Sequence, residues 1–488
     1  MAERNAALGI TRYGAYLPRL RLQRKAVADA NAWFDASLQG LARGERTMCN
    51  WDEDAITMAV EACADCLGAA PGPRPAALVL ASTSLPFLDR QNSVLVAEAL
   101  NLGAPGLRTL DVAASQRAAT SGLMAALDMA AAGRGEVLLV ASEHRKTRCG
   151  SREEMLYGDG AAAVALGTEG VVAELVATAS EPVDFVDHYR AEGYGFDYGW
   201  EERWIRDEGL MKIVPRATRA VLEAAGVAPG DVAHYVVPTD QAAVPAAIAK
   251  KVGIRAEAVA DNLPATVGIT GAAHPILLLA QRLEQAAPGD LLLVTGFGQG
   301  CDALLFRATA AVRDRRPARG VSGALAARRP EANYGKFQAF NDLVDRELGK
   351  RAEADKQSYL AAMYRNRGLV NGFVGGRCTA CGTVQIPKQN YCVNPECNAY
   401  DTQADHPMAG ARGRVATWTA DRLTFDFNPP AYFGLVVFEG GGRLMMDMTE
   451  VDPKTFDTGT EVSVHFRVKQ VDPQRGFRKY FWKAIPTT

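Results

Sequence analysis

Four of the nine cysteines lie within one stretch of twenty residues, and no other feature of the chain constrains a local fold so strongly. They form two pairs, Cys378 with Cys381 and Cys392 with Cys397, each in a turn that contains Gly or Pro. Four thiolates on two such turns make a closed tetrahedral site in which no ligand position is left for water. We therefore predict a structural metal, with zinc preferred over iron. The other five cysteines are scattered, which favours a reducing compartment over a disulfide framework.

The chain has 488 residues, which is too long for one ordinary core, so several domains are expected. Residues 1–310 alternate short apolar runs with Ala-rich helical stretches, a pattern typical of an α/β fold whose helices cover the sheets. Residues 311–372 are expected to form a linker and helices, beginning with an Arg-rich stretch at 312–330. Residues 373–400 should form the zinc ribbon. Residues 401–488 alternate apolar and polar side chains, as the strands of a small barrel do.

Charge and hydropathy argue against two classes of partner. The formal net charge of −2 provides no electrostatic basis for binding nucleic acid or an anionic membrane. No apolar run approaches the roughly 20 residues that a membrane-spanning helix needs. The first residues, Met-Ala-Glu-Arg-Asn, do not have the layout of a signal peptide. We expect a cytoplasmic protein without a nucleic-acid or membrane partner.

Two stretches of the C-terminal region, GGRCTACGTVQIPKQNYCVNPEC at 375–397 and GRVATWTADRL at 413–423, carry a resemblance to a known pair of domains. They resemble the rubredoxin-like zinc ribbon and OB-fold domain that accompanies enzymes of the thiolase superfamily. An OB fold alone would suggest oligonucleotide binding. The near-neutral charge and the lack of a basic and aromatic stripe argue against that function here.

Five motifs in residues 1–310 carry a second resemblance: GITRYGAYLPRLRL, YGDGAAAVALG, VDHYRAEG, VGITGAAH and TGFGQGCDALLF, in chain order. They resemble the hydroxymethylglutaryl-CoA synthase and ketoacyl synthase branches of the thiolase superfamily. The resemblance implies an αβαβα sandwich of five layers, built from two equivalent halves at about 1–170 and 171–310. It also implies a homodimer and an acyl-CoA thioester as substrate, so that CoA enters as part of the substrate.

The resemblance breaks down at the positions that carry the chemistry of the superfamily. Gln116 stands at the strand-to-helix elbow DVAASQRAATSGL, where a nucleophilic cysteine is expected. The general-base histidine is expected where Thr239 or Asp240 stands. Ile269 occupies the place of an oxyanion-hole asparagine, and Thr83 that of a catalytic glutamate. Because an amide cannot attack a thioester, we predict that the route through a covalent acyl-enzyme is closed.

One catalytic device is expected to remain, a turn of backbone N–H groups around Gly298 and Gly300. Preorganised donors of this kind stabilise the enolate oxygen of a thioester. Such an enolate forms when the bond between the α and β carbons of a β-hydroxyacyl-CoA is broken, and that step needs no nucleophile. Members of the superfamily that lack the cysteine and have the same ribbon and OB-fold partner resemble lyases of this type. We therefore expect aldol-type chemistry on an acyl-CoA, in either direction.

Five side chains are candidates for moving the proton or holding the substrate. His274 is one, because imidazole exchanges protons near neutral pH, and Asp240 is another because it adjoins the expected base position. Tyr157 and Tyr189 would need strong assistance as bases, since a tyrosine hydroxyl has a pKa of about 10. Gln116 could hold a substrate carbonyl through its amide. Each also has an ordinary structural interpretation as a helix cap, an exposed carboxylate or a packing residue.

Three other functions stay open. The first is a Claisen-type synthase or thiolase with a relocated nucleophile, Cys301 or Cys149, although both thiols are also typical of small packing residues. The second is a decarboxylase in which Gln116 mimics an acyl group, but that route still needs the missing histidine and asparagine donors. The third is a non-catalytic scaffold that binds acyl-CoA.

Overall fold

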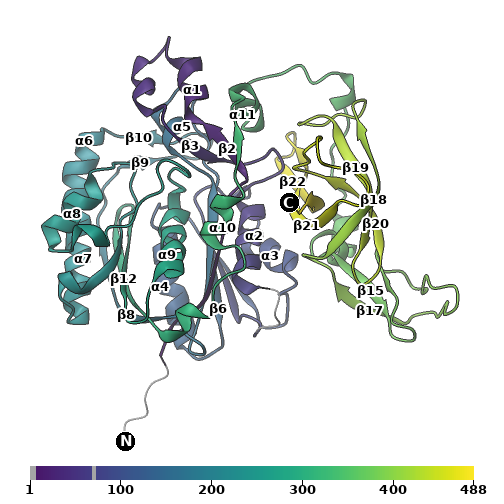
Figure 1. Cartoon of the computed structure of the whole chain (residues 1–488), viewed down its shortest axis with the longest axis horizontal. Coiled ribbons are helices and arrows are strands. Elements are labelled where there is room, and N and C mark those ends of the chain that lie inside the picture. The colour runs from purple at the N-terminus through teal and green to yellow at the C-terminus, as the bar shows by residue number, and fades with distance from the viewer. Residues whose placement is uncertain (1–6, 69–72, 488) are drawn as a thin grey trace, which may run out of the picture. The chain divides into compact units, whose positions relative to one another are not determined.

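The computed structural model describes residues 7–68 and 73–487, which form two compact units (Figure 1). The first unit ends at Val344 and the second begins at Asp345, except that Trp51–Glu53 and Val94–Gly103 belong to the second. The first unit therefore extends past residue 310, the expected end of the thiolase-like part. None of the helices in the described ranges is long and apolar enough to cross a membrane.

A sheet of nine strands forms the centre of the first unit. The order across the sheet is β11 (Val232–Val236), β12 (Leu291–Phe297), β13 (Gly300–Ala308), β8 (Ala173–Pro182), β1 (Gly9–Tyr16), β7 (Gly160–Gly167), β6 (Val137–Glu143), β4 (Ala77–Ala81) and β5 (Arg108–Val112). Strands β4, β6 and β7 are buried along their whole length, as strands covered on both faces should be.

The sheet consists of two halves with the same pairing pattern. From β1 through β7 and β6 to β4, two antiparallel pairings are followed by a parallel one, and β8, β13, β12 and β11 repeat this sequence. The halves meet where β1 pairs with β8 through Gly9 with Glu174 and Ile10 with Ala173. A Cβ on Gly9 would lie 2.1 Å from the carbonyl oxygen of Ala173, so only glycine fits this junction.

Helices complete the layers, as Figure 1 shows. Helix α2 (Ala55–Leu67) covers the first half, α4 (Ala118–Ala131) and α9 (His274–Gln285) lie between the halves, and α7 (Met211–Ala225) and α8 (Val244–Val252) cover the second half. One apolar core joins α4 and α9 to strands of both halves, and a second lies under α7 and α8. This arrangement confirms the predicted five-layer αβαβα sandwich.

The segment after β13 falls in the range 311–372, for which a linker and helices were expected, and it contains helices α10 (Gly320–Ala326), α11 (Tyr334–Phe340), α12 (Leu360–Arg365) and α13 (Arg367–Val370). Helix α10 begins where both oxygens of the buried Asp65 carboxylate accept backbone N–H groups, from Arg319 and Gly320, each at 2.9 Å. Strand β14 (Arg329–Glu331) then pairs in parallel with β2 (Leu20–Gln23). Phe337, on α11 (Tyr334–Phe340), is buried against a small apolar cluster. The Arg-rich composition concealed these contacts, and the segment up to Val344 is part of the first unit.

The second unit contains a ribbon and a barrel. The ribbon is a sheet in the order β16 (Val384–Gln385), β15 (Val374–Cys378) and β17 (Gln403–Pro407). The barrel is closed by β18 (Arg412–Asp421), β19 (Ala431–Phe438), β20 (Arg443–Met448), β22 (Phe477–Pro486) and β21 (Glu461–Asp472), in that order. The alternating strands expected from the sequence therefore do close into a barrel.

Shorter helices and strands connect these elements. They are α1 (Arg24–Asn31), β3 (Glu45–Met48), α3 (Asn92–Ala99), α5 (Arg152–Leu156), β9 (His188–Tyr189), β10 (Tyr198–Gly199), α6 (Glu202–Trp204), α12 (Leu360–Arg365) and α13 (Arg367–Val370).

Candidate active site

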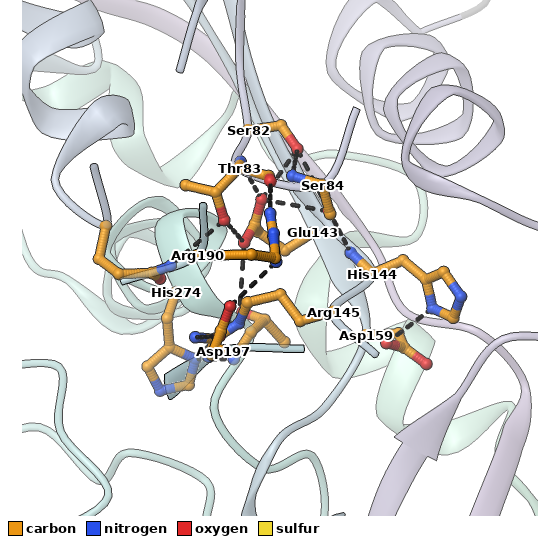
Figure 2. A network of polar contacts seen from close by, with 12 residues as sticks. Ser82, Thr83, Ser84, Glu143, His144, Arg145, Asp159, Arg190, Asp197 and His274 are labelled. Carbon is orange, nitrogen blue, oxygen red and sulfur yellow. Dashed lines mark hydrogen bonds and ion pairs between the residues drawn. The ribbon is translucent and has the colours of Figure 1, made fainter. Parts of the chain in front are cut away.

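A cluster of polar side chains lies where the parallel strands β4 and β6 end beside each other (Figure 2). Ser82, Thr83 and Ser84 follow β4, and Glu143 is the last residue of β6. The carboxyl ends of parallel strands meet at one edge of a sheet, and ligands of open α/β sheets bind there. Both Ser82 and Glu143 are fully buried. The cluster of Ser82, Thr83, Ser84 and Glu143 is called the Glu143 cluster below.

The Glu143 carboxylate is the acceptor of every hydroxyl in this cluster. Ser82 Oγ donates at 2.8 Å and Thr83 Oγ1 at 2.7 Å, while Ser84 Oγ lies at 3.3 Å. The backbone N–H of Thr83 also donates to it. A buried carboxylate needs such partners, because without them burial would favour its neutral form. The donors fix the orientation of Glu143, and three of them are hydroxyls that can also pass on a proton.

Gln116 joins the Glu143 cluster from the elbow before α4. Its amide Nε2 donates to Thr83 Oγ1 over 3.2 Å. Gly271, at φ +50°, leaves room for this contact, since a Cβ there would lie 2.5 Å from Glu143 Oε2 and 2.9 Å from Gln116 Oε1. The structure thus brings together the two substituted positions, Gln116 and Thr83, and adds a carboxylate from the neighbouring strand.

The glycine turn of the second half packs directly against this elbow. A Cβ on Gly298 would lie 2.9 Å from Arg117 N and 3.1 Å from Gln116 N. Ser115 Oγ also donates to the Gly298 carbonyl, over 2.9 Å. The elbow and the turn come from different halves of the sandwich, so the site is formed where the halves face each other.

The donors of this turn differ from the expected ones. The N–H of Gly298 donates to the carbonyl oxygen of Gly300 over 3.0 Å, so it is used within the turn itself. Gly300, at φ +112°, packs against β8. A Cβ on this residue would lie 2.2 Å from the Glu181 carbonyl oxygen. Among the hydrogen bonds of residues 7–68 and 73–487, none uses the backbone N–H of Gln116 or of Gln299. These two N–H groups belong to the segments that meet at Gly298.

A second group of charged residues lies beside the Glu143 cluster (Figure 2). The buried Arg145 guanidinium stacks on the Tyr157 ring, 3.6 Å from its centroid, with Nη1 at 3.3 Å from Asp197 Oδ2 and Nε at 3.8 Å from Glu143 Oε2. Arg190 Nη1 contacts Asp197 Oδ1 at 3.0 Å, and its guanidinium also donates to the Thr83 carbonyl. Asp197 therefore holds two arginines next to the cluster.

Tyr157 is close to the site but is not a ready base. Burial raises its pKa to about 12, although the charge of Arg145 opposes this effect. Its backbone forms a bridge with Ile269, in the loop where an oxyanion-hole asparagine was expected. The hydroxyl is therefore suited to donating a hydrogen bond while it stays protonated.

His274 is held in a fixed structural position. It is fully buried, Nδ1 lies 3.1 Å from Thr270 Oγ1, and Nε2 lies 3.1 Å from the Asn262 carbonyl oxygen, which can only accept. Burial lowers its pKa to about 3, so the ring is neutral at ordinary pH. With both nitrogens engaged, His274 is not arranged to exchange protons with a substrate.

Asp240 and Tyr189 lie outside the Glu143 cluster. The Asp240 side chain is 35% exposed and 3.8 Å from Arg152, and partial burial raises its pKa. Tyr189 is 52% exposed and packs on Tyr198, with ring centroids 5.4 Å apart. Its neighbour Arg190 is the residue of this segment that reaches the cluster.

Neither candidate thiol lies in the Glu143 cluster. Cys301 is fully buried in the apolar core under α7 and α8, and burial raises its pKa. Cys149 is exposed, with its Sγ 3.4 Å from Gln338 Nε2. No contact in the described part of the chain places either sulfur beside Gln116.

The sequence interpretation missed four residues of this site: Glu143, Arg145, Arg190 and Asp197. Glu143 ends the apolar run EVLLVASE, and a single acid at the end of a buried strand is a weak signal. Arg190 and Asp197 are 107 and 114 residues away from Thr83 along the chain, counted from their numbers. Only the folded sheet brings these groups together.

The four ribbon cysteines fit a tetrahedral metal. Their sulfurs all lie within 4.8 Å of one another, at 3.9 Å between Cys378 and Cys397 and at 3.6 Å between Cys381 and Cys392. Two thiolates that share a tetrahedral zinc lie roughly 3.8 Å apart, since each Zn–S bond is about 2.3 Å. The donor set is complete without water, so the residues suit a structural zinc.

Two family models match the chain. The C-terminal domain of 3-oxoacyl-[acyl-carrier-protein] synthase III matches residues 222–307, and the ChsH2 rubredoxin-like zinc ribbon domain matches residues 365–399. The second match contains all four ribbon cysteines.

Solved structures support the fold assignment. A hydroxymethylglutaryl-CoA synthase complexed with CoA superimposes with a TM-score of 0.59 at 17% identity, covering 72% of this chain and 95% of its own. The 3-oxoacyl-(acyl carrier protein) synthase III of Pseudomonas aeruginosa PAO1 gives 0.54 at 25% identity, covering 62% and 98%.

Related sequences decide the family. The hydroxymethylglutaryl-CoA synthase of Pyrobaculum neutrophilum is 30% identical over 320 residues, which are 64% of this chain and 90% of the relative. The enzyme of the same name from Aeropyrum pernix is 28% identical over 351 residues, 70% of this chain and 97% of the relative. On this similarity, the chain belongs to the hydroxymethylglutaryl-CoA synthase family.

Proposed function

We propose that this protein makes or breaks a carbon–carbon bond of an acyl-CoA by aldol-type chemistry, through a thioester enolate and without a covalent acyl-enzyme. The observation that carries the proposal is the hydrogen bond from Gln116 to Thr83, whose hydroxyl in turn donates to Glu143. This chain of groups offers a proton path at the place where a family nucleophile would stand. It offers no sulfur.

In the cleavage direction, the β-hydroxyl of the substrate gives its proton to Thr83 Oγ1 as Thr83 passes its own to Glu143. The bond between the α and β carbons then breaks, its electron pair moves into the thioester enolate, and an aldehyde or ketone is released. Glu143 then gives up the proton it received, which reaches the α carbon of the enolate, and the shorter acyl-CoA leaves with Glu143 ionised again. Atoms and charge balance without an external oxidant or reductant. Condensation runs through the same steps in reverse.

The enolate oxygen needs donors, and two backbone N–H groups can supply them. Those of Gln116 and Gln299 lie on the elbow and on the turn that meet at Gly298. Preorganised donors of this kind act where charge develops during the reaction. The Arg145 guanidinium, 3.8 Å from Glu143, adds a positive charge that offsets the anion formed in the site.

The names of the relatives support a CoA thioester as substrate, since they are hydroxymethylglutaryl-CoA synthases and one solved structure is described as complexed with CoA. They also favour a second candidate, a synthase of Claisen type. That candidate needs a nucleophile, and it predicts an acyl group bonded to a side chain.

We also propose a homodimer. Strand β5 is the last strand at its edge of the nine-stranded sheet among the described residues, and on its outer side the Thr109 carbonyl oxygen accepts Gln91 Nε2 over 2.6 Å. A second copy of the chain could extend the sheet across this edge, as unpaired edge strands readily do.

The test is turnover of a panel of β-hydroxyacyl-CoAs by the full chain, with released aldehydes and ketones trapped by a hydrazine and the acyl-CoA products measured by mass spectrometry. We expect release by the native protein and a loss of about 10²–10⁴-fold in Glu143→Gln. Glu61→Gln is the matched control, because Glu61 is also buried but lies on α2 outside the site.

Intact-mass measurement during turnover separates the alternatives. The proposal expects no mass added to the protein. An acyl adduct on any side chain would support the Claisen candidate instead. Tight binding of CoA esters without turnover across the panel would leave only a scaffold.

A further inference from the structure

A second cluster of metal-ligating groups lies next to the Glu143 cluster, and the proposed reaction does not use it. Cys49 follows β3, His144 follows β6, and Asp159 precedes β7. One ligand atom from each of them, a sulfur, a ring nitrogen and a carboxylate oxygen, lies within 4.8 Å of the other two. Figure 2 shows His144 and Asp159 beside the active-site residues.

The distances within this cluster are close to those around a bound ion. His144 Nδ1 lies 3.1 Å from Asp159 Oδ1. A nitrogen and an oxygen that share a tetrahedral zinc at about 2.0–2.1 Å lie roughly 3.3 Å apart. Cys49 Sγ is 3.7 Å from the Met58 sulfur, so a further soft atom adjoins the thiol. Small side-chain movements would bring the three ligand atoms around one cation.

Contacts outside the three ligand atoms hold the carboxylate in place. Asp159 Oδ2 accepts the backbone N–H of Cys49 over 2.8 Å, and the Asp159 N–H donates to Thr47 Oγ1 over 2.7 Å. The Oδ1 atom is thereby directed at His144. Such supporting hydrogen bonds orient ligands in metal sites and tune their affinity.

The burial of the three residues fits an ion that keeps one open position. Cys49 and Asp159 are each 2% exposed, whereas the His144 side chain is 13% exposed. Three protein ligands from Cys, His and Asp leave a fourth tetrahedral place for water, which is the arrangement of an open zinc site.

We propose that Cys49, His144 and Asp159 form a second metal site, which takes one Zn²⁺ with water as its fourth ligand. The site is separate from the ribbon and belongs to the first unit. It adjoins the catalytic residues through the His144 backbone N–H, which donates to Ser84 Oγ over 2.8 Å. The bound ion would therefore fix the position of Ser84, which in turn contacts Glu143 at 3.3 Å.

The test is the zinc content of the full chain after saturation with zinc and desalting, measured by elemental mass spectrometry. We expect about two zinc ions per native chain and about one in each of two variants, Cys49→Ser and His144→Gln. The ribbon variant Cys378→Ser/Cys381→Ser should also retain about one. Cys149→Ser, which removes an exposed thiol outside both sites, should keep two.

Cobalt substitution adds a readout that identifies the ligands. In the ribbon variant, Co²⁺ should still give tetrahedral d–d bands with a single thiolate charge-transfer contribution, and both should disappear when His144→Gln is added. The melting transition of the first unit, which contains all three residues, serves as the folding control for Cys49→Ser and His144→Gln. One zinc per native chain after saturation, or an unchanged zinc content in both variants, would overturn the proposal. In either case, His144 and Asp159 would form a hydrogen-bonded pair without a metal.

Discussion

Gln116 and Thr83 are hydrogen-bonded to each other, with 3.2 Å between Nε2 and Oγ1. The sequence identified both as substitutions, at the places of a cysteine and a glutamate. The fold shows that they are neighbours and that a carboxylate is still present, since Glu143 accepts the Thr83 hydroxyl at 2.7 Å. The two substitutions and Glu143 therefore have to be tested as one unit.

Removing the Thr83 hydroxyl should interrupt the proposed proton path. Thr83→Val keeps the shape of the side chain but loses the group that donates to Glu143, so we expect kcat to fall about 10²-fold or more. Thr83→Ser keeps the hydroxyl and should stay within a few-fold of the native rate. The measurement is carbonyl release from the best substrate of the panel. Equal activity in Thr83→Val and Thr83→Ser would argue against a relay through this hydroxyl.

Adding a methyl group at Gly298 should disturb the elbow. The new Cβ would lie 2.9 Å from Arg117 N, so the turn and the elbow must move apart. We expect Gly298→Ala to lower the free energy of unfolding by about 1–3 kcal/mol and to reduce kcat more than substrate binding. Gly230→Ala is the control, because no heavy atom lies within 4 Å of its Cβ position. Thermal melts and kinetics of both variants check this, and identical behaviour would contradict the packing argument.

The buried His274 predicts how stability depends on pH. Its pKa in the folded state is about 3, below the ordinary value of 6.5, so the unfolded chain binds this proton more readily. The stabilisation that comes from keeping His274 neutral is fully present above about pH 6.5. It is lost as the pH falls from there towards 3, and the free energy of unfolding then decreases by up to about 1.4 kcal/mol per pH unit.

The check compares melting of the first unit between pH 8 and pH 4.5 in the native protein and in His274→Gln. The variant should be less stable at pH 8 but should lose part of the acid dependence. The pH profile of kcat should show no ionisation that His274→Gln abolishes. Parallel stability curves for the two proteins would show that His274 does not titrate in this way.

Loss of the ribbon metal should affect the second unit selectively. Cys392→Ser removes one of the four sulfurs that suit a tetrahedral metal, so residues 365–410 should become sensitive to protease. The first unit has its own core and should keep its melting transition. Proteolysis followed by peptide mapping measures the protease sensitivity of residues 365–410. Calorimetry measures the melting transition of the first unit. Protection of the ribbon after verified metal loss would contradict a structural role.

The proposed dimer can be tested at the sheet edge. Leu110 is on β5 and is 38% exposed, so Leu110→Asp places a charge where a second sheet would pair. We expect the mass measured by light scattering to fall from two chains to one. Leu88→Asp changes a residue that is 93% exposed and outside the strand, and it should leave the mass unchanged. A native monomer would overturn the dimer itself.

Most of the fold could be predicted from the sequence because its signals are local. Apolar runs alternating with Ala-rich stretches predicted a mixed α/β fold, and the resemblance to the thiolase superfamily added the five-layer sandwich. The spacing of Cys378, Cys381, Cys392 and Cys397 predicted the ribbon. The contacts of the segment at 312–330 could not be read from the sequence, because the Asp65 carboxylate that receives two of its N–H groups lies more than 250 residues away along the chain.

The site was harder to predict because its parts are distant in sequence. Gln116 was identified through the elbow, but Glu143 was missed because its hydroxyl donors follow another strand about 60 residues earlier. Conversely, His274 attracted attention by residue type alone. Its burial and its contacts with Thr270 and Asn262 were not readable from the chain.

The junction at Gly9 has a consequence for the reaction. The elbow that carries Gln116 and the turn that carries Gln299 come from opposite halves, and these halves are aligned where β1 runs against β8. Even a methyl group on residue 9 would collide with the Ala173 backbone and push β1 and β8 apart at this junction. We expect the spacing between the two N–H groups proposed to bind the enolate to change, although Gly9 lies outside the Glu143 cluster. The geometry of the proposed reaction thus depends partly on a backbone junction that contains no reactive group.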